Sequence, residues 1–229
     1  MSISTASGGL STLRGIKVIS LDLDGTIVDK RVMDYFWLEL IPQRYAALKG
    51  LELREAKEIV LREYDKVGME DIRWYLPDYW ARRFGLEGYL EELFEDLRSH
   101  VRSRICKDVF DLLRAVPDEY SLIISSNAAR EFIKMVVEEL EPYSRRFQRF
   151  FSCVSDFYIT RKDARFYRAV CRTLGVKPSE IIHVGDHEVY DYEVPRSVGL
   201  KALLLIREGV SARENVETIR SLRELLHYL

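Results

Sequence analysis

The sequence predicts an α/β protein in which a parallel-sheet core carries an inserted helical segment. Short apolar runs rich in β-branched residues alternate with amphipathic helical patterns over most of the 229 residues, and this alternation is typical of parallel sheets. One long stretch in the first half of the chain breaks the alternation and contains helical patterns only. A chain of this length with 47% hydrophobic residues can bury a sizeable core without disulfides or a structural metal.

Four apolar runs predict buried strands, and a fifth run is a weaker candidate. The four runs are Ile16–Leu21, Ser121–Ser125, Ile181–Val184 and Leu200–Leu205, and the fifth is Phe151–Val154. Polar residues follow the first three runs directly. Because ligands of parallel α/β sheets bind beyond the carboxyl ends of the strands, we expect a functional site where these polar residues meet.

Helical patterns then divide the chain into a core and an insert. Apolar residues at i, i+3, i+4 and i+7 predict core helices over Asp108–Val116, Arg130–Leu140 and Asp163–Leu174. The stretch without strands predicts four more helices, over Arg31–Leu48, Leu53–Lys66, Ile72–Arg83 and Tyr89–Ser103. We therefore expect an α/β core from residues 15–28 and 106–229, a helical insert from residues 29–105, and a flexible leader over residues 1–14.

Composition argues against several classes of protein. The formal net charge of −2 argues against a strongly basic nucleic-acid clamp. No apolar run approaches the ~20 residues of a membrane span, and the N-terminus does not resemble a secretory signal. Three cysteines without C-x-x-C spacing predict free thiols rather than disulfides or a zinc site. We expect a cytoplasmic monomer or homodimer with no membrane or nucleic-acid partner; the 31% of charged residues hints at a thermophilic source.

One segment offers an alternative on nucleic-acid binding. In Tyr143–Phe151 arginines alternate with aromatic residues, and such interleaving can stack bases. The competing interpretation is an amphipathic helix end or an edge near the cleft. The net charge of −2 favours this second interpretation.

The first strand leads into an acidic motif, Asp22-Leu23-Asp24-Gly25-Thr26. Alternate residues of an extended strand share a face, so Asp22 and Asp24 point the same way, and Gly25 permits a turn that aims both into one cleft. Two carboxylates this close form a hard-cation site or an acid–base pair. Solvated loop aspartates are the alternative, which the strand before them and the Gly25-Thr26 turn after them disfavour.

Polar residues follow two further strands in the same way. Asp186 comes directly after the third predicted strand and Asp191 follows five residues later; they could complete a cation site or only cap a helix. Ser126 and Asn127 lie between a strand and a helix. There a hydroxyl and backbone N–H groups can bind an anion, or can simply cap the helix.

A basic pair, Arg161 and Lys162, precedes the third core helix. A cation at a helix N-terminus opposes the helix dipole, so a purely structural purpose is not obvious. Pairing with an anion or with the aspartates would justify it. A solvated basic pair is the alternative.

In this order and spacing the four motifs resemble those of the haloacid dehalogenase (HAD) superfamily, over about Val18 to Leu204. That family is defined by D-x-D-G-T, a Ser or Thr at the end of the second strand, a Lys, and G-D-x(4)-D. The resemblance implies a Rossmann-like core with a mobile cap, and an insert after the first motif corresponds to the helical C1 type of cap. A gapless match to the K-P-D-P pattern of the family puts Arg161 in the lysine position. We expect Lys162 to fill it instead, because the family usually uses a lysine there and a one-residue shift in a loop costs little.

The resemblance also implies a mechanism that uses Mg²⁺. Asp22 would attack phosphorus and form an aspartyl-phosphate, and Asp24 would protonate the leaving oxygen and then take a proton from water. Asp22, Asp186 and the backbone carbonyl of Asp24 would hold the Mg²⁺. The other implied residues bind the phosphoryl group (Ser126, Asn127, Lys162) or support the site (Gly25, Thr26, Asp191).

Asp24 favours phosphoryl transfer over dehalogenation, because dehalogenases of this superfamily need no metal and characteristically lack the second aspartate. A phosphomutase would keep the same core residues, and a catalytically silent protein could use the cleft to bind a phosphorylated ligand; both alternatives stay open. We expect a phosphatase that acts on a small phosphorylated metabolite selected by the cap. The candidate cap residues for this selection are Arg31, Tyr35, Arg73, Trp74, Tyr75, Arg82 and Arg83.

Overall fold

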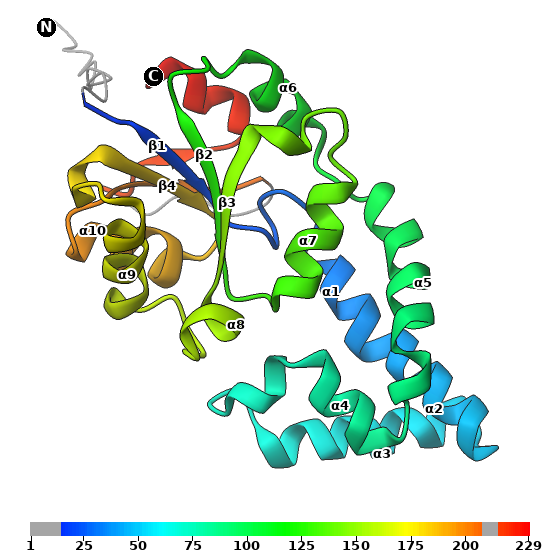
Figure 1. The fold of residues 1–229 in the computed structure, drawn as a ribbon. Helices are drawn as coiled ribbons and strands as arrows, with labels where there is room; N and C mark the ends of the chain where they lie inside the picture. Colours follow the sequence, from blue (N-terminus) through cyan, green and yellow to red (C-terminus); the bar gives the residue numbers. More distant parts are fainter. Residues whose placement is uncertain (1–14, 208–214) are drawn as a thin grey trace, which may run out of the picture.

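A six-stranded parallel sheet forms the centre of the protein (Figure 1). The computed structural model describes residues 15–207 and 215–229, so the predicted leader lies outside the described residues. The strands are β1 (Val18–Leu21), β2 (Ser121–Ser126), β3 (Phe147–Ser152), β4 (Ile181–Gly185), β5 (Lys201–Leu205) and β6 (Thr218–Ile219). Their spatial order is β3-β2-β1-β4-β5-β6. The direction in which the chain adds strands reverses between β1 and β4, and such a switch point is where ligands bind.

Helices cover both faces of this sheet, which confirms the predicted α/β fold class (Figure 1). The core helices are α6 (Lys107–Ala115), α7 (Arg130–Glu138), η4 (Ser144–Arg146), α8 (Cys153–Phe157), α9 (Ala164–Leu174), η5 (Pro178–Glu180), η6 (Glu188–Glu193), α10 (Val194–Ser197) and η7 (Leu222–His227). In β1, Leu21 packs in the apolar cluster of α6 and α7, whereas Val18 packs in the cluster of α9. Within the described residues, no helix combines the length and the apolar character needed to cross a membrane.

The four predicted strands are present, with bounds that differ by no more than two residues. The weaker candidate, Phe151–Val154, is wrong in its second half, because β3 ends at Ser152 and a helix follows at once. The Ser152 hydroxyl accepts a hydrogen bond from the backbone N–H of Ser155 at 2.9 Å, which caps this helix. Two exposed residues in the middle of β3 interrupt the apolar pattern, so the sequence does not mark the true start of the strand.

The segment Tyr143–Phe151 forms a single helical turn, η4, followed by the edge strand β3. Its Arg146 donates a hydrogen bond to the backbone carbonyl of Val116 at 2.7 Å and pairs with Asp118 at 2.5 Å. At least this arginine therefore has partners within the core. The segment is an edge of the sheet rather than a helix end.

The insert is helical throughout and forms the lower right part of Figure 1. We call it the cap. Its elements are α1 (Arg31–Tyr35), η1 (Phe36–Leu40), α2 (Ile41–Lys49), α3 (Leu53–Val67), η2 (Ile72–Tyr75), α4 (Pro77–Phe84), η3 (Glu87–Tyr89) and α5 (Leu90–Arg102).

Prolines explain two departures from the predicted cap helices. The predicted helix Arg31–Leu48 is continuous but widens into a π turn, η1, just before Pro42. Proline has no N–H to donate and its ring crowds the preceding turn. The predicted helix Ile72–Arg83 is interrupted at Leu76, which is extended because the residue before a proline, here Pro77, avoids helical geometry.

Two chain crossings connect the core and the cap, and they are hydrogen-bonded to each other. The backbone N–H of Asp29 donates to the carbonyl of Arg104 at 3.0 Å, and that of Cys106 donates to the carbonyl of Ile27 at 3.0 Å. An isolated β-bridge between Val28 and the returning chain lies between these bonds. The loop after β1 and the entry into α6 therefore hold each other in place.

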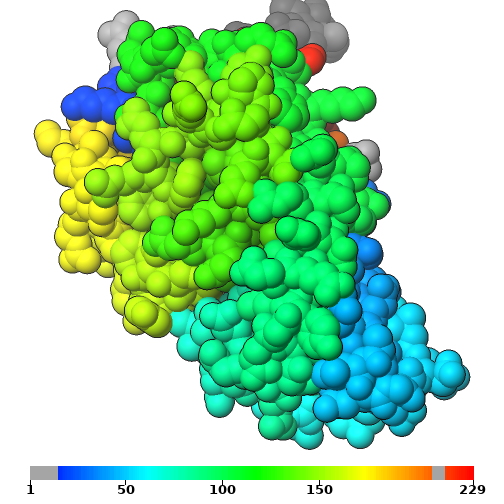
Figure 2. Space-filling view, turned by 45° about the vertical axis from the view of Figure 1, so that its right-hand side comes forward, coloured from blue at the N-terminus to red at the C-terminus, as the bar shows by residue number. Residues whose placement is uncertain are grey.

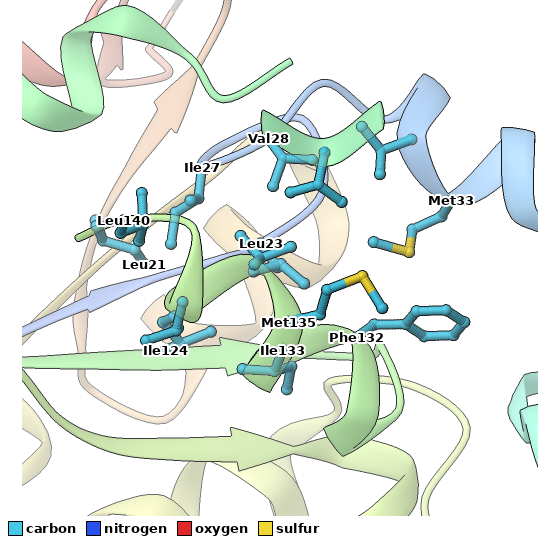
Figure 3. Packing of buried hydrophobic residues seen from close by; sticks show 14 of the residues in the cluster. Leu21, Leu23, Ile27, Val28, Met33, Ile124, Phe132, Ile133, Met135 and Leu140 are labelled. Carbon is cyan, nitrogen blue, oxygen red and sulfur yellow. The ribbon is translucent and has the colours of Figure 1, made fainter. Parts of the chain in front are cut away.

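The base of the cap also packs against the core helix α7. The ring of Phe132 on α7 lies with its centroid 5.0 Å from that of Phe36 and 5.7 Å from that of Phe94, both in the cap. In Figure 3, Met33 of the cap and Met135 of α7 point toward each other beside Phe132. One apolar cluster therefore runs from the sheet into the cap, and the surface is unbroken between them on the face seen in Figure 2.

Ion pairs join cap and core at both ends of the cap. At the base, Arg102 of α5 pairs with Glu139, just after α7, at 2.7 Å. At the far end, Glu70 pairs with Arg161 in the loop before α9. Such exposed pairs each add little stability, so the apolar cluster around Phe132 is the main anchor of the cap.

We expect Phe132→Ala to lower the free energy of unfolding by about 3–5 kcal/mol, because this ring is 2% exposed and fills the junction of cap and core. Urea unfolding followed by circular dichroism would measure the change. Tyr158→Ala is the control, since that ring is 80% exposed and its loss should cost no more than about 0.5 kcal/mol. Equal effects of the two variants would contradict an anchor at Phe132.

Candidate active site

The loop after β1 holds the first acidic motif at the switch point of the sheet. The backbone N–H of Asp22 donates to the carbonyl of Val184 on β4 at 2.9 Å, and Asp22 is 5% exposed. Gly25 has a φ of +75°, and a Cβ at this position would overlap the carboxylate of Asp186. Glycine is therefore required both for the turn and for the close approach of the second acidic motif.

The second acidic motif follows β4 and reaches the same point. Gly185 ends the strand, and a Cβ there would overlap the carboxylate of Asp191 on η6. Asp191 is buried, whereas Asp186 is exposed. One carboxylate oxygen from each of Asp22, Asp186 and Asp191 lies within 4.8 Å of the others. The fold therefore brings together the acidic residues of two motifs that are far apart in sequence.

Lys162 lies within this cluster and is 4% exposed. Its ammonium group forms ion pairs with Asp22 and, at 2.5 Å, with Asp191. The side chain of Arg161 instead reaches Glu70 of the cap. The loop before α9 thus places Lys162, and not Arg161, beside Asp22.

The predicted anion-binding residues lie at the end of β2. Because β2 pairs in parallel with β1, Ser126 lies beside the loop of Asp22. Its hydroxyl accepts a hydrogen bond from the backbone N–H of Ala128 at 3.1 Å. The side-chain amide of Asn127 donates to the carbonyl of Thr160 at 3.2 Å. This bond links the loop after β2 to the loop that carries Lys162.

Burial sets the ionisation of the acidic residues. It raises the pKa of Asp22 well above its usual value, against the opposing charge of Lys162, and raises the pKa of Asp24 to about 7. Asp191 behaves differently. Burial also acts to raise its pKa, but the charge of Lys162 and a hydrogen bond from His183 hold that pKa well below the usual range.

The cluster fits a hard divalent cation such as Mg²⁺, for which carboxylate oxygens are preferred ligands. Four carboxylates surround a single ammonium group, so negative charge is in excess. One carboxylate oxygen of Asp24 is buried, and no partner for it exists in the part of the chain that the structure describes. Both oxygens of Asp191 already accept hydrogen bonds. Asp22 and Asp186 are therefore the side chains placed to hold the cation, and the resemblance to the family adds the backbone carbonyl of Asp24.

Two residues that the sequence interpretation missed are connected to this site. His183, inside β4, lies with its Nε2 3.0 Å from a carboxylate oxygen of Asp191. Arg207, just after β5, donates to the carbonyl of Thr26 at 2.7 Å and to the carboxylate of Asp108 at 2.7 Å. A polar residue within an apolar run, and an arginine at the carboxyl end of a strand, are the sequence signals that could have found them.

Several cap residues expected to contact substrate have partners inside the cap. Arg73 pairs with Asp71 at 2.6 Å and Arg83 pairs with Glu63 at 2.5 Å. The hydroxyl of Tyr75 donates to a backbone carbonyl of the preceding loop at 3.2 Å. These contacts stabilise the end of the cap that faces the loop before α9. The side chains that were expected to select the substrate therefore already have partners within the cap.

A pocket of about 580 Å³ opens beside the acidic cluster. Its lining includes Gly25 and Asp186 of the two acidic motifs, Lys30 at the entry to the cap, and Arg207. This volume lies within the range typical of small-molecule sites. A small ligand can therefore reach the acidic cluster from this side.

The parallel sheet, its acidic switch point and its helical cap define a class of α/β hydrolases. The chain belongs to the haloacid dehalogenase-like hydrolases, whose family model matches residues 16–199. This match confirms the resemblance found in the motifs.

Individual relatives share the fold and differ in chemistry. The GMP/IMP nucleotidase YrfG of Escherichia coli (strain K12) is 24% identical over 173 residues, which cover 76% of this chain and 75% of that protein. The HAD phosphatase from Thermococcus onnurineus has a TM-score of 0.72 at 23% identity, over 93% of this chain and 97% of that one. The 2-haloacid dehalogenase from Pseudomonas syringae pv. Tomato DC3000 has a TM-score of 0.67 at 19% identity, with the same coverage. The fold alone does not separate these chemistries.

We expect Mg²⁺ to bind more weakly as the pH falls, because burial raises the pKa of the ligand Asp22 well above its usual value and that of the neighbouring Asp24 to about 7. Although Asp186 is exposed, partial loss of hydration and the charge of Asp191 also raise its pKa, so the cation-free site holds protons that Mg²⁺ must displace. Raising the pH removes these protons and strengthens binding. Calorimetry at about pH 6 and about pH 8, in buffers of different ionisation enthalpy, would measure both affinity and proton release.

Two variants make this measurement specific. Asp186→Asn should weaken Mg²⁺ binding at both pH values, because it removes a ligand. Asp118→Asn should change nothing, because that side chain is 93% exposed and lies on the surface. An affinity for Mg²⁺ that is the same at both pH values would contradict the expectation.

Proposed function

We propose that this protein is a Mg²⁺-dependent phosphatase that hydrolyses a small phosphorylated metabolite through an aspartyl-phosphate on Asp22. The observation that carries the proposal is the buried cluster in which the Lys162 ammonium contacts Asp22, while oxygens of Asp22 and Asp186 lie close enough to share a cation. The cluster offers an anionic nucleophile, a positive charge for a phosphoryl oxygen, and a place for a metal ion. Membership of the hydrolase family supports the same chemistry.

In the first step, a carboxylate oxygen of Asp22 attacks phosphorus and the bond from phosphorus to the leaving oxygen breaks. Asp24 gives its proton to that oxygen. In the second step, the Asp24 carboxylate takes a proton from water, whose oxygen attacks phosphorus and frees Asp22 and inorganic phosphate. The pKa of Asp24, raised by burial to about 7, suits a group that gives and takes a proton near neutral pH.

Positive charge around the phosphoryl group supports both steps. Lys162 would neutralise one phosphoryl oxygen, and in a buried site such a charge acts more strongly than in water. Ser126, Asn127 and nearby backbone N–H groups would orient the other oxygens. A bound Mg²⁺ would supply further positive charge and offset the repulsion between the phosphate and the aspartates.

Nucleoside monophosphates are the first substrates to test, because the Escherichia coli relative is named a GMP/IMP nucleotidase. The pocket of about 580 Å³ beside the acidic cluster is of a size that such a metabolite requires. Asp24 supports phosphoryl transfer over the dehalogenation for which one fold neighbour is named. A phosphomutase, or a protein that binds a phosphorylated ligand without turnover, would use the same residues.

We expect Asp22→Asn to lower kcat for an aryl phosphate by roughly 10³-fold or more, because an amide cannot act as the nucleophile. The fold should be retained, since Lys162 keeps its ion pair with Asp191. Released phosphate and the circular dichroism spectrum would be measured on the same samples. Asp118→Asn, an exposed change of the same kind, is the control. A well-folded Asp22→Asn variant with near wild-type turnover would exclude Asp22 as the nucleophile.

A substrate panel separates the remaining alternatives. With Mg²⁺ present we expect phosphate release from GMP, IMP, sugar phosphates or an aryl phosphate, and no halide release from 2-chloropropionate. Excess chelator should stop the reaction, and added Mg²⁺ should restore it. Halide release, or full activity in chelator, would contradict the proposal. Isomerisation without free phosphate would indicate a mutase, and binding without turnover would indicate a silent ligand-binding protein.

A further inference from the structure

A line of buried polar side chains crosses the centre of the sheet beneath the acidic cluster. The hydroxyl of Ser20 on β1 lies 2.9 Å from that of Ser125 on β2 and 2.8 Å from Nδ1 of His183 on β4. Nε2 of His183 then lies 3.0 Å from the carboxylate of Asp191. None of these four residues is more than 1% exposed. Strands of a parallel sheet are usually apolar, so these buried polar side chains need an explanation.

Hydrogen-bond chemistry fixes the direction of this line. The Asp191 carboxylate can only accept, so Nε2 of His183 must carry a proton and donate it. Burial lowers the pKa of His183, which keeps the ring neutral, and Nδ1 must then accept from the hydroxyl of Ser20. The oxygen of Ser20 in turn accepts from the hydroxyl of Ser125. Every donor in the line therefore points toward Asp191.

Packing leaves the imidazole ring of His183 little freedom to turn. The ring of Tyr167 lies edge-on to it, with centroids 5.2 Å apart. The hydroxyl of Tyr167 donates to the carbonyl of Tyr190 at 2.7 Å, and Tyr167 is 1% exposed. The ring is held from one side by Tyr167 and, across the sheet, by Ser20 on the neighbouring strand β1.

Asp191 passes this fixed orientation on to the catalytic lysine. The oxygen that faces His183 also accepts from Lys162 at 2.5 Å, and its other oxygen accepts from the backbone N–H of His187 at 3.1 Å. The carboxylate cannot rotate without losing one of these three bonds. Lys162 spans from Asp191 to Asp22, so the orientation of Asp191 determines where the ammonium lies relative to the nucleophile.

We propose that His183 is a positioning residue, whose neutral Nε2–H tautomer locks the Asp191 carboxylate and so holds the Lys162 ammonium on Asp22. Its effect on turnover rests on the proposed function, while its tautomer does not. Loss of the Nε2–H donor lets Asp191 turn and displaces Lys162. The phosphate contacts of Ser126 and Asn127 do not pass through this line, so kcat should fall much more than KM rises.

Three variants separate positioning from general stability. His183→Leu removes the donor and should lower kcat about 10–100-fold, the usual effect of removing a supporting hydrogen bond, with KM within about twofold of wild type. His183→Gln places an amide N–H near the position of Nε2 and should restore most of the kcat. Val116→Ala is the control for stability, because that side chain is buried just before the amino end of β2, away from the line, and its loss should leave kcat unchanged.

A second measurement reads the tautomer without any assay of activity. The chain has four histidines, so the signals of His183 in ¹⁵N-histidine-labelled protein with Mg²⁺ can be assigned by their absence in a variant. We expect a neutral ring protonated at Nε2 between about pH 6 and about pH 8. Ser20→Ala, which removes the donor to Nδ1, should reduce the population of this tautomer and lower kcat several-fold. It also serves as the test variant if His183→Leu does not fold.

The outcomes are distinct. An Nδ1–H tautomer or a charged ring in the wild-type protein would overturn the proposal, and so would wild-type kcat in a folded His183→Leu or Ser20→Ala variant. Equal kcat losses in His183→Leu, His183→Gln and Val116→Ala would mean that His183 only stabilises the fold. If the wild-type protein has no phosphatase activity, the proposed function fails, and the tautomer measurement still decides whether His183 orients Asp191.

Discussion

The ion pairs of one buried ammonium group with two buried carboxylates are the contacts on which the rest of the site depends. Lys162, Asp22 and Asp191 are almost fully buried, and removing the shared ammonium would leave buried carboxylates without their counter-charge, at a cost of about 3–5 kcal/mol. The surrounding structure serves this arrangement. Gly25 and Gly185 have no side chain where the carboxylates of the second motif must approach. The excess negative charge that remains is what a divalent cation would offset.

The packing of the cap restricts how a lid could work in this protein. The resemblance to the family implies a mobile cap, but here Phe132 of the core belongs to the same apolar cluster as the cap residues beside it. A swing of the whole cap about its two crossings would separate these rings and expose apolar surface. At the far end, the ion pair of Glu70 with Arg161 lies at the surface, where such a pair adds little stability. Movement over the site therefore costs the least free energy when it is confined to the far end of the cap.

Sequence periodicity was sufficient for four of the six strands and for the three longest core helices, because a buried strand and an amphipathic helix leave regular patterns. The two acidic motifs were recognised because they directly follow two of those strands. Periodicity failed at β3, whose middle is exposed at the sheet edge, and it gave no signal for β6, which is two residues long. Which of Arg161 and Lys162 approaches Asp22 depends on one residue of register in a loop, which no pattern encodes. The bond between His183 and Asp191 could not be predicted either, because it depends on how η6 packs back against the end of β4.

The last strands of the sheet show how distant parts of the chain stabilise the first acidic motif. Asp108, in the first turn of α6, accepts hydrogen bonds from Arg207, from the Ser221 hydroxyl and from the backbone N–H of Leu222. Through Arg207 this carboxylate is connected to the carbonyl of Thr26, within the turn that follows Asp24. A carbonyl bonded to a guanidinium group cannot rotate freely, so the turn keeps the shape that directs Asp24 into the site. Ser221 and Leu222 thus help to fix the backbone of the loop that carries Asp22 and Asp24, although the described residues after β5 contribute nothing to the acidic cluster.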